Sequence, residues 1–492
     1  MKDLKEKTVR AGFVKIWSQA GMFLLRMGSL MVLARLLEPK DFGLVAMVTV
    51  VTGVFGLFQD AGLSLATVQR ATITEEQIST LFWVNVLVGT ALCFLSLALA
   101  PILVSFYHEP RLFWLTLVSA AGFIVKAVGV QHGALLQRQM RFTALAFIEI
   151  LSYFVGSVVG IGMALAGCGY WSLLGLAVAP TATSTVCVWL AVPWVPGRPH
   201  RGAEVRSMIG FGGQVISNSV IGYFSSNLDK VLLGRYWGSE ALGIYGRAYQ
   251  FISIPRENLD SAAGMVALAA LSRLQDDHDR FKSYFLKGYN LVLALVVPTA
   301  VASALFADEI VLVVLGPAWK DAAVLLRLLT PTVLIFGLIN PLRWLLWAIG
   351  RGGRCLRIAL VLALLVTISY AVGLRYGPKG VAFAYSAVMT LWFIPHMIWS
   401  VRNTMVSLGD LFRVARRPLV SSLVAGVLGF GVVFIFGRSL PALGRLVLGG
   451  GVLIAIYLWM LLFVMKQKAF YWDLARGMLK RPADPGQGPA PV

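Results

Sequence analysis

Charged side chains occur inside several long apolar runs of this 492-residue sequence. They are Lys15, Arg26, Asp60, Lys126, Glu149, Asp229, Lys230, Arg247, Arg256, Glu257, Asp260, Lys287, Arg327 and Arg343. Each would cost about 2.5 to 3.5 kcal/mol at the centre of a membrane-spanning helix, so they are expected to face a cavity or one another. Bases outnumber acids in this set, and an anionic ligand is the natural complement of that surplus.

The first apolar run carries the clearest pattern. A set of mostly polar and charged residues is spaced by three and four, which places them along one helical stripe; they are Lys15, Ser18, Gln19, Met22, Arg26 and Ser29. Arg26 lies near mid-span, too deep for its guanidinium to reach the membrane surface comfortably. We therefore predict a cationic substrate-binding cavity lined by Arg26, Lys15, Lys126, Arg247 and Arg256. The alternatives are a structural ion pair for Arg26 and a surface-reaching side chain for Lys15.

The motifs of soluble catalytic chemistry are not found in the sequence. It has no Walker A loop, no HExxH and no G-x-S-x-G, and we expect neither ATP hydrolysis nor metal-dependent glycosyl transfer. The four cysteines are scattered and form neither a CxxC pair nor a group with histidines. We expect no enzymatic activity, no catalytic residues, no metal site and no cofactor.

Composition identifies the elements that must position the charges. With 58% apolar and 13% charged residues and a mean hydropathy of +0.78, the chain cannot be a water-soluble fold. About twenty apolar residues cross a bilayer, and runs of that kind predict about fourteen transmembrane helices. The pair Gly156 and Gly160 forms a GxxxG motif, which predicts close helix packing.

The net charge of +20 is mainly a signal of topology. Lysine and arginine concentrate in alternate loops and in both tails, so the positive-inside rule predicts that both termini are cytoplasmic. Nucleic-acid binding is not needed to explain the charge. The loops on the other side are short, the longest running from about Asp308 to Lys320, and leave no room for an external domain.

An internal repeat appears when the sequence is displaced by 200 residues. Residues 34–44 then align with residues 234–244, and Asp60 aligns with Asp260. Six predicted helices separate the copies, so both insert with the same polarity, as in transporters built from parallel repeats. The predicted fold is an all-α polytopic membrane protein with two parallel six-helix repeats and two C-terminal helices. Its segments are an N-terminal lobe (1–192), a cytoplasmic linker (193–207), a C-terminal lobe (208–400), an amphipathic linker (401–417), the last two helices (418–465) and a cytoplasmic tail (466–492).

Three acidic residues are candidates for a gate or for ion coupling. Asp60 and Asp260 are equivalent under the repeat, and Asp229 lies within a predicted span. For Asp60 and Asp260, helix capping or pairing with Arg256 explains the sequence equally well. Asp229 and Lys230 are neighbours and cannot face the same way on a helix, so we expect one of them at the external boundary.

The segment Leu33–Ala46, followed by Phe58–Ser64 and Val68–Arg70, resembles the N-terminal signature of Wzx-type oligosaccharide-lipid flippases. This family is the polysaccharide transporter branch of the MOP superfamily, which also contains MATE exporters and the lipid II flippase. The resemblance implies a bacterial inner-membrane transporter for an undecaprenyl-pyrophosphate-linked oligosaccharide. It further implies two lobes around a cationic cavity, with membrane lipid around the carrier tail. A polysaccharide polymerase and other assembly proteins are candidate partners.

Three alternatives compete with this hypothesis. A MATE-like exporter of cationic drugs should have an acidic cavity, contrary to the basic surplus. A membrane polymerase or ligase of the same pathway usually needs a sizeable external loop, which is lacking here. A purely structural role in an envelope assembly is the third.

Overall fold

The computed structural model describes residues 19, 21–59, 67–68, 73–200, 206–437, 439–469 and 471–472. Within α8, the side chains of 206–222, 225, 254–263, 265–266 and 268–269 are outside that description. The described chain is helical almost throughout and contains no β-strand in those ranges. The predicted all-α class is confirmed.

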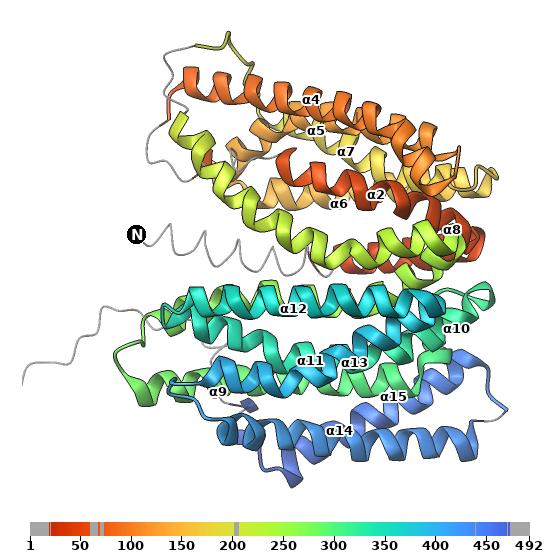
Figure 1. Cartoon of the computed structure of the whole chain (residues 1–492), viewed down its shortest axis with the longest axis vertical. Helices are drawn as coiled ribbons and strands as arrows, with labels where there is room; N and C mark the ends of the chain where they lie inside the picture. The colour runs from red at the N-terminus through yellow and green to blue at the C-terminus, as the bar shows by residue number, and fades with distance from the viewer. Residues whose placement is uncertain are drawn as a thin grey trace, which may run out of the picture. The chain divides into compact units, whose positions relative to one another are not determined.

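Long helices follow one another along the described chain (Figure 1). They are α2 (Pro39–Gln59), α4 (Glu75–Tyr107), α5 (Leu112–Arg138), α6 (Phe142–Leu165), α7 (Trp171–Ala191), α8 (Arg206–Ser272), α9 (His278–Leu305), α10 (Ala307–Val314), α11 (Lys320–Ala348), α12 (Gly352–Gly373), α13 (Gly377–Val401), α14 (Leu408–Phe436) and α15 (Ala442–Trp459). Residues 21–36 are also helical. A π-helical turn, Met460–Val464, extends α15.

Ten segments of the described chain are long and apolar enough to cross a membrane. One of them, Gly352–Val401, contains both α12 and α13. The long α8 is two helices joined at Gly238, whose φ of 80° and ψ of −176° interrupt the helix. Glycine is the residue that adopts a positive φ without steric cost. Together with the helix of residues 21–36, these elements account for the fourteen predicted crossings.

The chain divides into two compact units. Unit 1 comprises Met1–Tyr249, Val314–Leu325 and Leu365–Tyr385. In it α4 packs against α5, α5 against α7, and α6 against α7 (Figure 1). A Cβ on Gly156 would lie 2.3 Å from the Pro180 ring, and one on Gly160 would lie 3.0 Å from the carbonyl oxygen of Ser172. The predicted role of the GxxxG pair in close packing is confirmed.

Alternate turns of unit 1 meet at opposite ends of its helices. At one end, the Trp319 indole donates a hydrogen bond of 2.8 Å to the Ala34 carbonyl. At the other end, Arg138 donates to the carbonyl of Thr67 and Arg141 to that of Ala191, each at 2.8 Å. This alternation is what successive membrane crossings require.

Unit 2 comprises Gln250–Val313, Leu326–Leu364 and Ser386–Val492. Its α14 packs against α9 and α15 (Figure 1). A capping box between Ser407 and Asp410 starts α14, and Lys282 of α9 pairs with Asp410 at 2.6 Å. The cap satisfies the first backbone N–H groups of the helix and sets its start at Leu408. The basic residues up to Arg417 form the first part of α14, which continues to Phe436.

Candidate substrate-binding site

The side chains of four predicted site residues can be placed: Arg26, Lys126, Asp229 and Arg247. Lys15 and Asp60 lie outside the described residues. Arg256 and Asp260 lie in α8, but their side chains fall in the part of that helix that is not described. The roles predicted for these last four residues stay predictions.

Arg26 is held against α6. Its guanidinium carbon lies 5.7 Å from the centroid of the Tyr153 ring, within the range of a cation–π contact. One turn further along both helices, the Ser29 hydroxyl donates to the Ser157 hydroxyl at 2.7 Å. This buried hydrogen bond fixes the register of the two helices. Arg26 forms no ion pair with an acidic side chain among the described residues.

Arg247, from the part of α8 beyond Gly238, lies over the ring of Phe42 with 4.4 Å between its guanidinium carbon and the ring centroid. The Phe42 ring in turn packs edge-on against Trp319 at 5.1 Å. Phe42 and Trp319 are almost entirely buried, so the surface on which Arg247 rests is rigid. The segment Leu33–Ala46 thus supplies the aromatic ring over which the Arg247 guanidinium lies.

Tyr153 connects the two arginines. Both Arg26 and Arg247 interact electrostatically with its phenol group. The structure therefore brings together two cations from helices that are far apart in sequence, and we call them the Arg26–Arg247 pair. Their guanidiniums can donate several hydrogen bonds in fixed directions, and such forks match the oxygens of phosphate groups.

Lys126 is exposed on α5. No hydrogen bond or ion pair is found for it within the described ranges, and nothing there links it to the Arg26–Arg247 pair. Its predicted part in the cavity stays a prediction.

Asp229 is fully buried in unit 1, with 0% of its surface exposed. Its Oδ2 accepts a hydrogen bond of 2.7 Å from the Tyr245 hydroxyl, whereas Oδ1 has no hydrogen-bond partner in the described structure. Tyr370 is close enough to interact electrostatically with this carboxyl group, and its ring packs on that of Tyr385 at 5.5 Å between centroids. A buried carboxyl with one unused oxygen is costly unless it holds a proton or a cation.

The adjacent Lys230 does not pair with Asp229. Its ammonium group donates to the Asn227 side chain at 2.8 Å and lies 5.2 Å from the Tyr249 ring centroid. The side chains of Asp229 and Lys230 therefore face different directions.

Sequence reasoning missed Tyr153 and Trp319. For Tyr153 a signal was present, because Glu149, Tyr153 and Ser157 recur at four-residue spacing within one apolar run. For Trp319 there was none. It lies in a predicted external loop, where a tryptophan is ordinarily an interfacial anchor.

Long apolar helices, an internal repeat and cations held inside the spans are features of multi-pass membrane transporters. The profile of the family described as "Polysaccharide biosynthesis protein" matches residues 32–324, more than half of the chain. The chain belongs to this family, and the predicted resemblance to the Wzx-type branch of the MOP superfamily is confirmed.

Curated relatives agree with this assignment. The chain is 25% identical over 380 residues to the teichuronic acid biosynthesis protein TuaB of Bacillus subtilis, covering 76% of this chain and 78% of that protein. It is 25% identical over 358 residues to the lipopolysaccharide biosynthesis protein WzxC of Escherichia coli, covering 71% of each. Identity to the succinoglycan biosynthesis transport protein ExoT of Rhizobium meliloti is 23%, over 96% of both chains.

Two solved structures show the fold. The inward closed conformation of the lipid II flippase MurJ matches with a TM-score of 0.70 at 14% identity, covering 94% of this chain and 100% of that one. An inward-facing MATE family multidrug transporter of the MOP superfamily matches with a TM-score of 0.61 at 13% identity, covering 79% and 95%. The predicted polytopic helical fold is confirmed.

Proposed function

We propose that this protein is a flippase that moves an undecaprenyl-pyrophosphate-linked oligosaccharide across the bacterial inner membrane by alternating access. The product would serve the synthesis of O-antigen, capsule or exopolysaccharide. The observation that carries the proposal is the Arg26–Arg247 pair. Both guanidiniums interact electrostatically with the Tyr153 phenol group inside the spans. TuaB, WzxC and ExoT are named for teichuronic acid biosynthesis, lipopolysaccharide biosynthesis and succinoglycan transport, which supports a saccharide substrate.

The pair has the chemistry to hold a pyrophosphate. Arg26 lacks an acidic partner among the described residues, so a charged ligand would neutralise it without displacing an existing ion pair. The Tyr153 hydroxyl can add a hydrogen bond to the same phosphate oxygens. Because the guanidiniums rest on aromatic rings, capture of a ligand would cost little side-chain ordering.

We further propose that Asp229 couples transport to an ion or proton gradient. Asp229 and Tyr245 lie in the parts of α8 before and after Gly238. Gain or loss of a cation at the unused Oδ1 of Asp229 would therefore change the charge between these two helices. A site of that kind shifts the balance between two conformations by its differential affinity for them. The role of Asp60 and Asp260 as a symmetric gate or ion-linked pair is retained as part of the proposal.

The competing functions fit less well. A carrier of cationic drugs would need acidic groups where Arg26 and Arg247 lie, and the proposal includes no catalytic step, metal or cofactor. We propose that both termini lie in the cytoplasm, as the charge distribution predicts. A polysaccharide polymerase and other assembly proteins would receive the product on the external side.

The test is complementation of a flippase-null strain whose glycosyltransferases and polymerase are intact. The wild-type chain should restore surface polysaccharide, and spheroplasts should show the lipid-linked oligosaccharide accessible to an added impermeant lectin. If the oligosaccharide stays inaccessible at normal membrane abundance of the protein, the flippase proposal is wrong. In a second strain that also lacks the polymerase, the oligosaccharide should become accessible yet stay unpolymerised, and polymerisation there would favour the polymerase alternative.

A further inference from the structure

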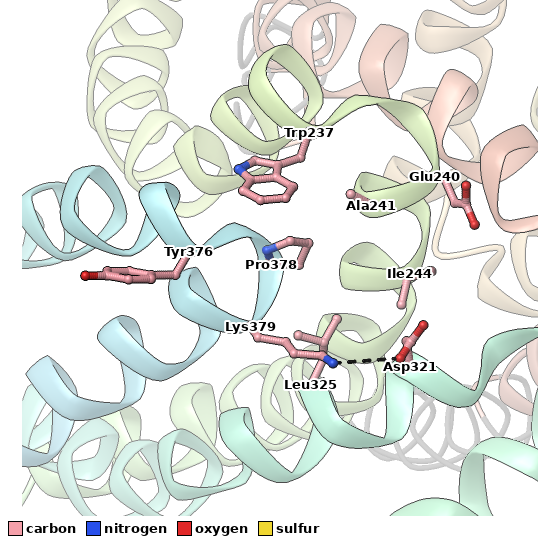
Figure 2. Close-up of a pocket in the computed structure, with 9 residues that line it drawn as sticks. All are labelled: Trp237, Glu240, Ala241, Ile244, Asp321, Leu325, Tyr376, Pro378 and Lys379. Carbon is pink, nitrogen blue, oxygen red and sulfur yellow. Dashed lines mark ion pairs between the residues drawn. The ribbon is translucent and has the colours of Figure 1, made fainter.

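A pocket of about 390 Å³ opens in unit 1 where α8 resumes after Gly238, beside the start of α11 and the start of α13 (Figure 2). Trp237, Pro378 and the Lys379–Asp321 pair lie around it, and Glu240 stands at its edge. We call it the Trp237 pocket. Its turns belong to the end of unit 1 that the charge distribution predicts to be external.

The tryptophan is fixed in place. Its indole nitrogen donates a hydrogen bond of 2.8 Å to the Leu374 carbonyl. A Cβ on Gly377 would lie 3.1 Å from carbons of the Trp237 ring, so a larger residue would crowd the ring. Gly377 also has a φ of +71°, which favours glycine. Even so, 47% of Trp237 remains exposed. The pocket therefore presents a rigid aromatic surface that is accessible from outside the protein.

The polar groups of the pocket are available to a ligand. Lys379 and Asp321 are 3.9 Å apart at the limit of an ion pair, and their side chains are 60% and 70% exposed. Exposed pairs of this kind contribute little to stability. Their ammonium and carboxylate groups can therefore turn to hydrogen-bond a bound molecule at small cost.

We propose that the Trp237 pocket binds one sugar unit of the oligosaccharide on the external side, an inference that rests on the proposed flippase function. A pyranose has C–H groups with partial positive charge that suit the negative face of an indole. Its hydroxyls both donate and accept, which matches a carboxylate acceptor beside an ammonium donor. The volume is within the range of small-molecule sites.

The competing interpretation is that these aromatic residues only anchor the protein at the membrane surface. Tyr236, on the same turn, is 67% exposed and does not line the pocket, so it serves as the matched control. An interfacial anchor would depend on Tyr236 as much as on Trp237. A sugar site would depend on Trp237 and Asp321 but not on Tyr236.

The experiment uses the full chain in nanodiscs and, as the probe, the oligosaccharide released by mild acid from the lipid-linked intermediate of the native strain. Binding is measured by saturation-transfer NMR. Trp237→Ala and Asp321→Asn should each weaken binding about tenfold or more, and Tyr236→Ala should leave it unchanged. Asp321→Asn is a conservative change at an exposed site, so its effect is read even if Trp237→Ala fails to fold.

Absence of binding to the wild-type chain, or equal weakening by all three variants, would overturn the sugar site. Neither result touches the flippase proposal, because complementation by the wild-type chain is scored independently. Conversely, if the protein binds the oligosaccharide but never makes it accessible outside, the sugar site is supported and the flippase proposal is wrong.

Discussion

Gly43 and Gly243 pack reciprocally, each against the backbone that precedes the other. A Cβ on Gly43 would lie 1.7 Å from the carbonyl oxygen of Ser239, and one on Gly243 would lie 1.9 Å from that of Pro39. Pro39 and Ser239 are themselves equivalent under the repeat, so the two contacts are copies of one another. Such reciprocity is the signature of a two-fold relationship, and it shows that the repeated segments bind each other through their shared motif.

The first prediction concerns these glycines. Gly43→Ala and Gly243→Ala should each destabilise the protein by about 1 to 3 kcal/mol or more. The added methyl group would clash with a backbone carbonyl, which cannot move aside as a flexible side chain can. The measurement is thermal unfolding in detergent together with membrane abundance. Gly246→Ala is the control, since a Cβ there has open space and alanine is the better helix former. Equal tolerance at all three positions would refute the close contact.

The second prediction concerns the Arg26–Arg247 pair. Arg26→Ala should abolish complementation, whereas Arg26→Lys should retain part of it, because an ammonium keeps the charge but not the planar fork. The stacking of Arg247 on Phe42 predicts that Arg247→Ala is nearly as severe. Lys126→Ala should have a mild effect, because Lys126 is exposed on α5. Full activity of Arg26→Ala at normal abundance would make Arg26 a structural residue.

The third prediction concerns ion coupling. Asp229→Asn keeps an acceptor for the Tyr245 hydroxyl but cannot change its charge, so transport should lose its dependence on the imposed ion or pH gradient. The assay follows lectin accessibility in spheroplasts over a series of external pH values and ionophores. Asp60→Asn and Asp260→Asn should each alter the dependence on the gradient in the same assay, and the double variant should be no worse than either single variant. If all three variants respond to the gradients as the wild type does, these carboxylates are structural.

The fourth prediction concerns topology. Reporter fusions after Gly197 and Lys468 should report cytoplasm, and those after Lys40 and Ala318 should report the exterior. Within unit 1, the side-to-side alternation of turns places Lys40 and Ala318 at the end opposite Gly197. A cytoplasmic signal after Lys40 would invert the assignment and move the Trp237 pocket to the inner side.

The sequence by itself determined the helices, their alternation and the repeat, because hydropathy, loop charge and helical periodicity are properties of consecutive residues. It also indicated that Arg26 must meet an anion or a partner, since a cation in a span is costly wherever the helix packs. Only the tertiary structure shows that Arg26 lies over Tyr153, and it likewise decides the partners of other residues. Trp319 reaches Ala34 from far along the chain, Arg247 lies over Phe42, and Asp229 is enclosed by tyrosines. These contacts depend on how separate helices turn and slide against one another, and no local pattern encodes that geometry.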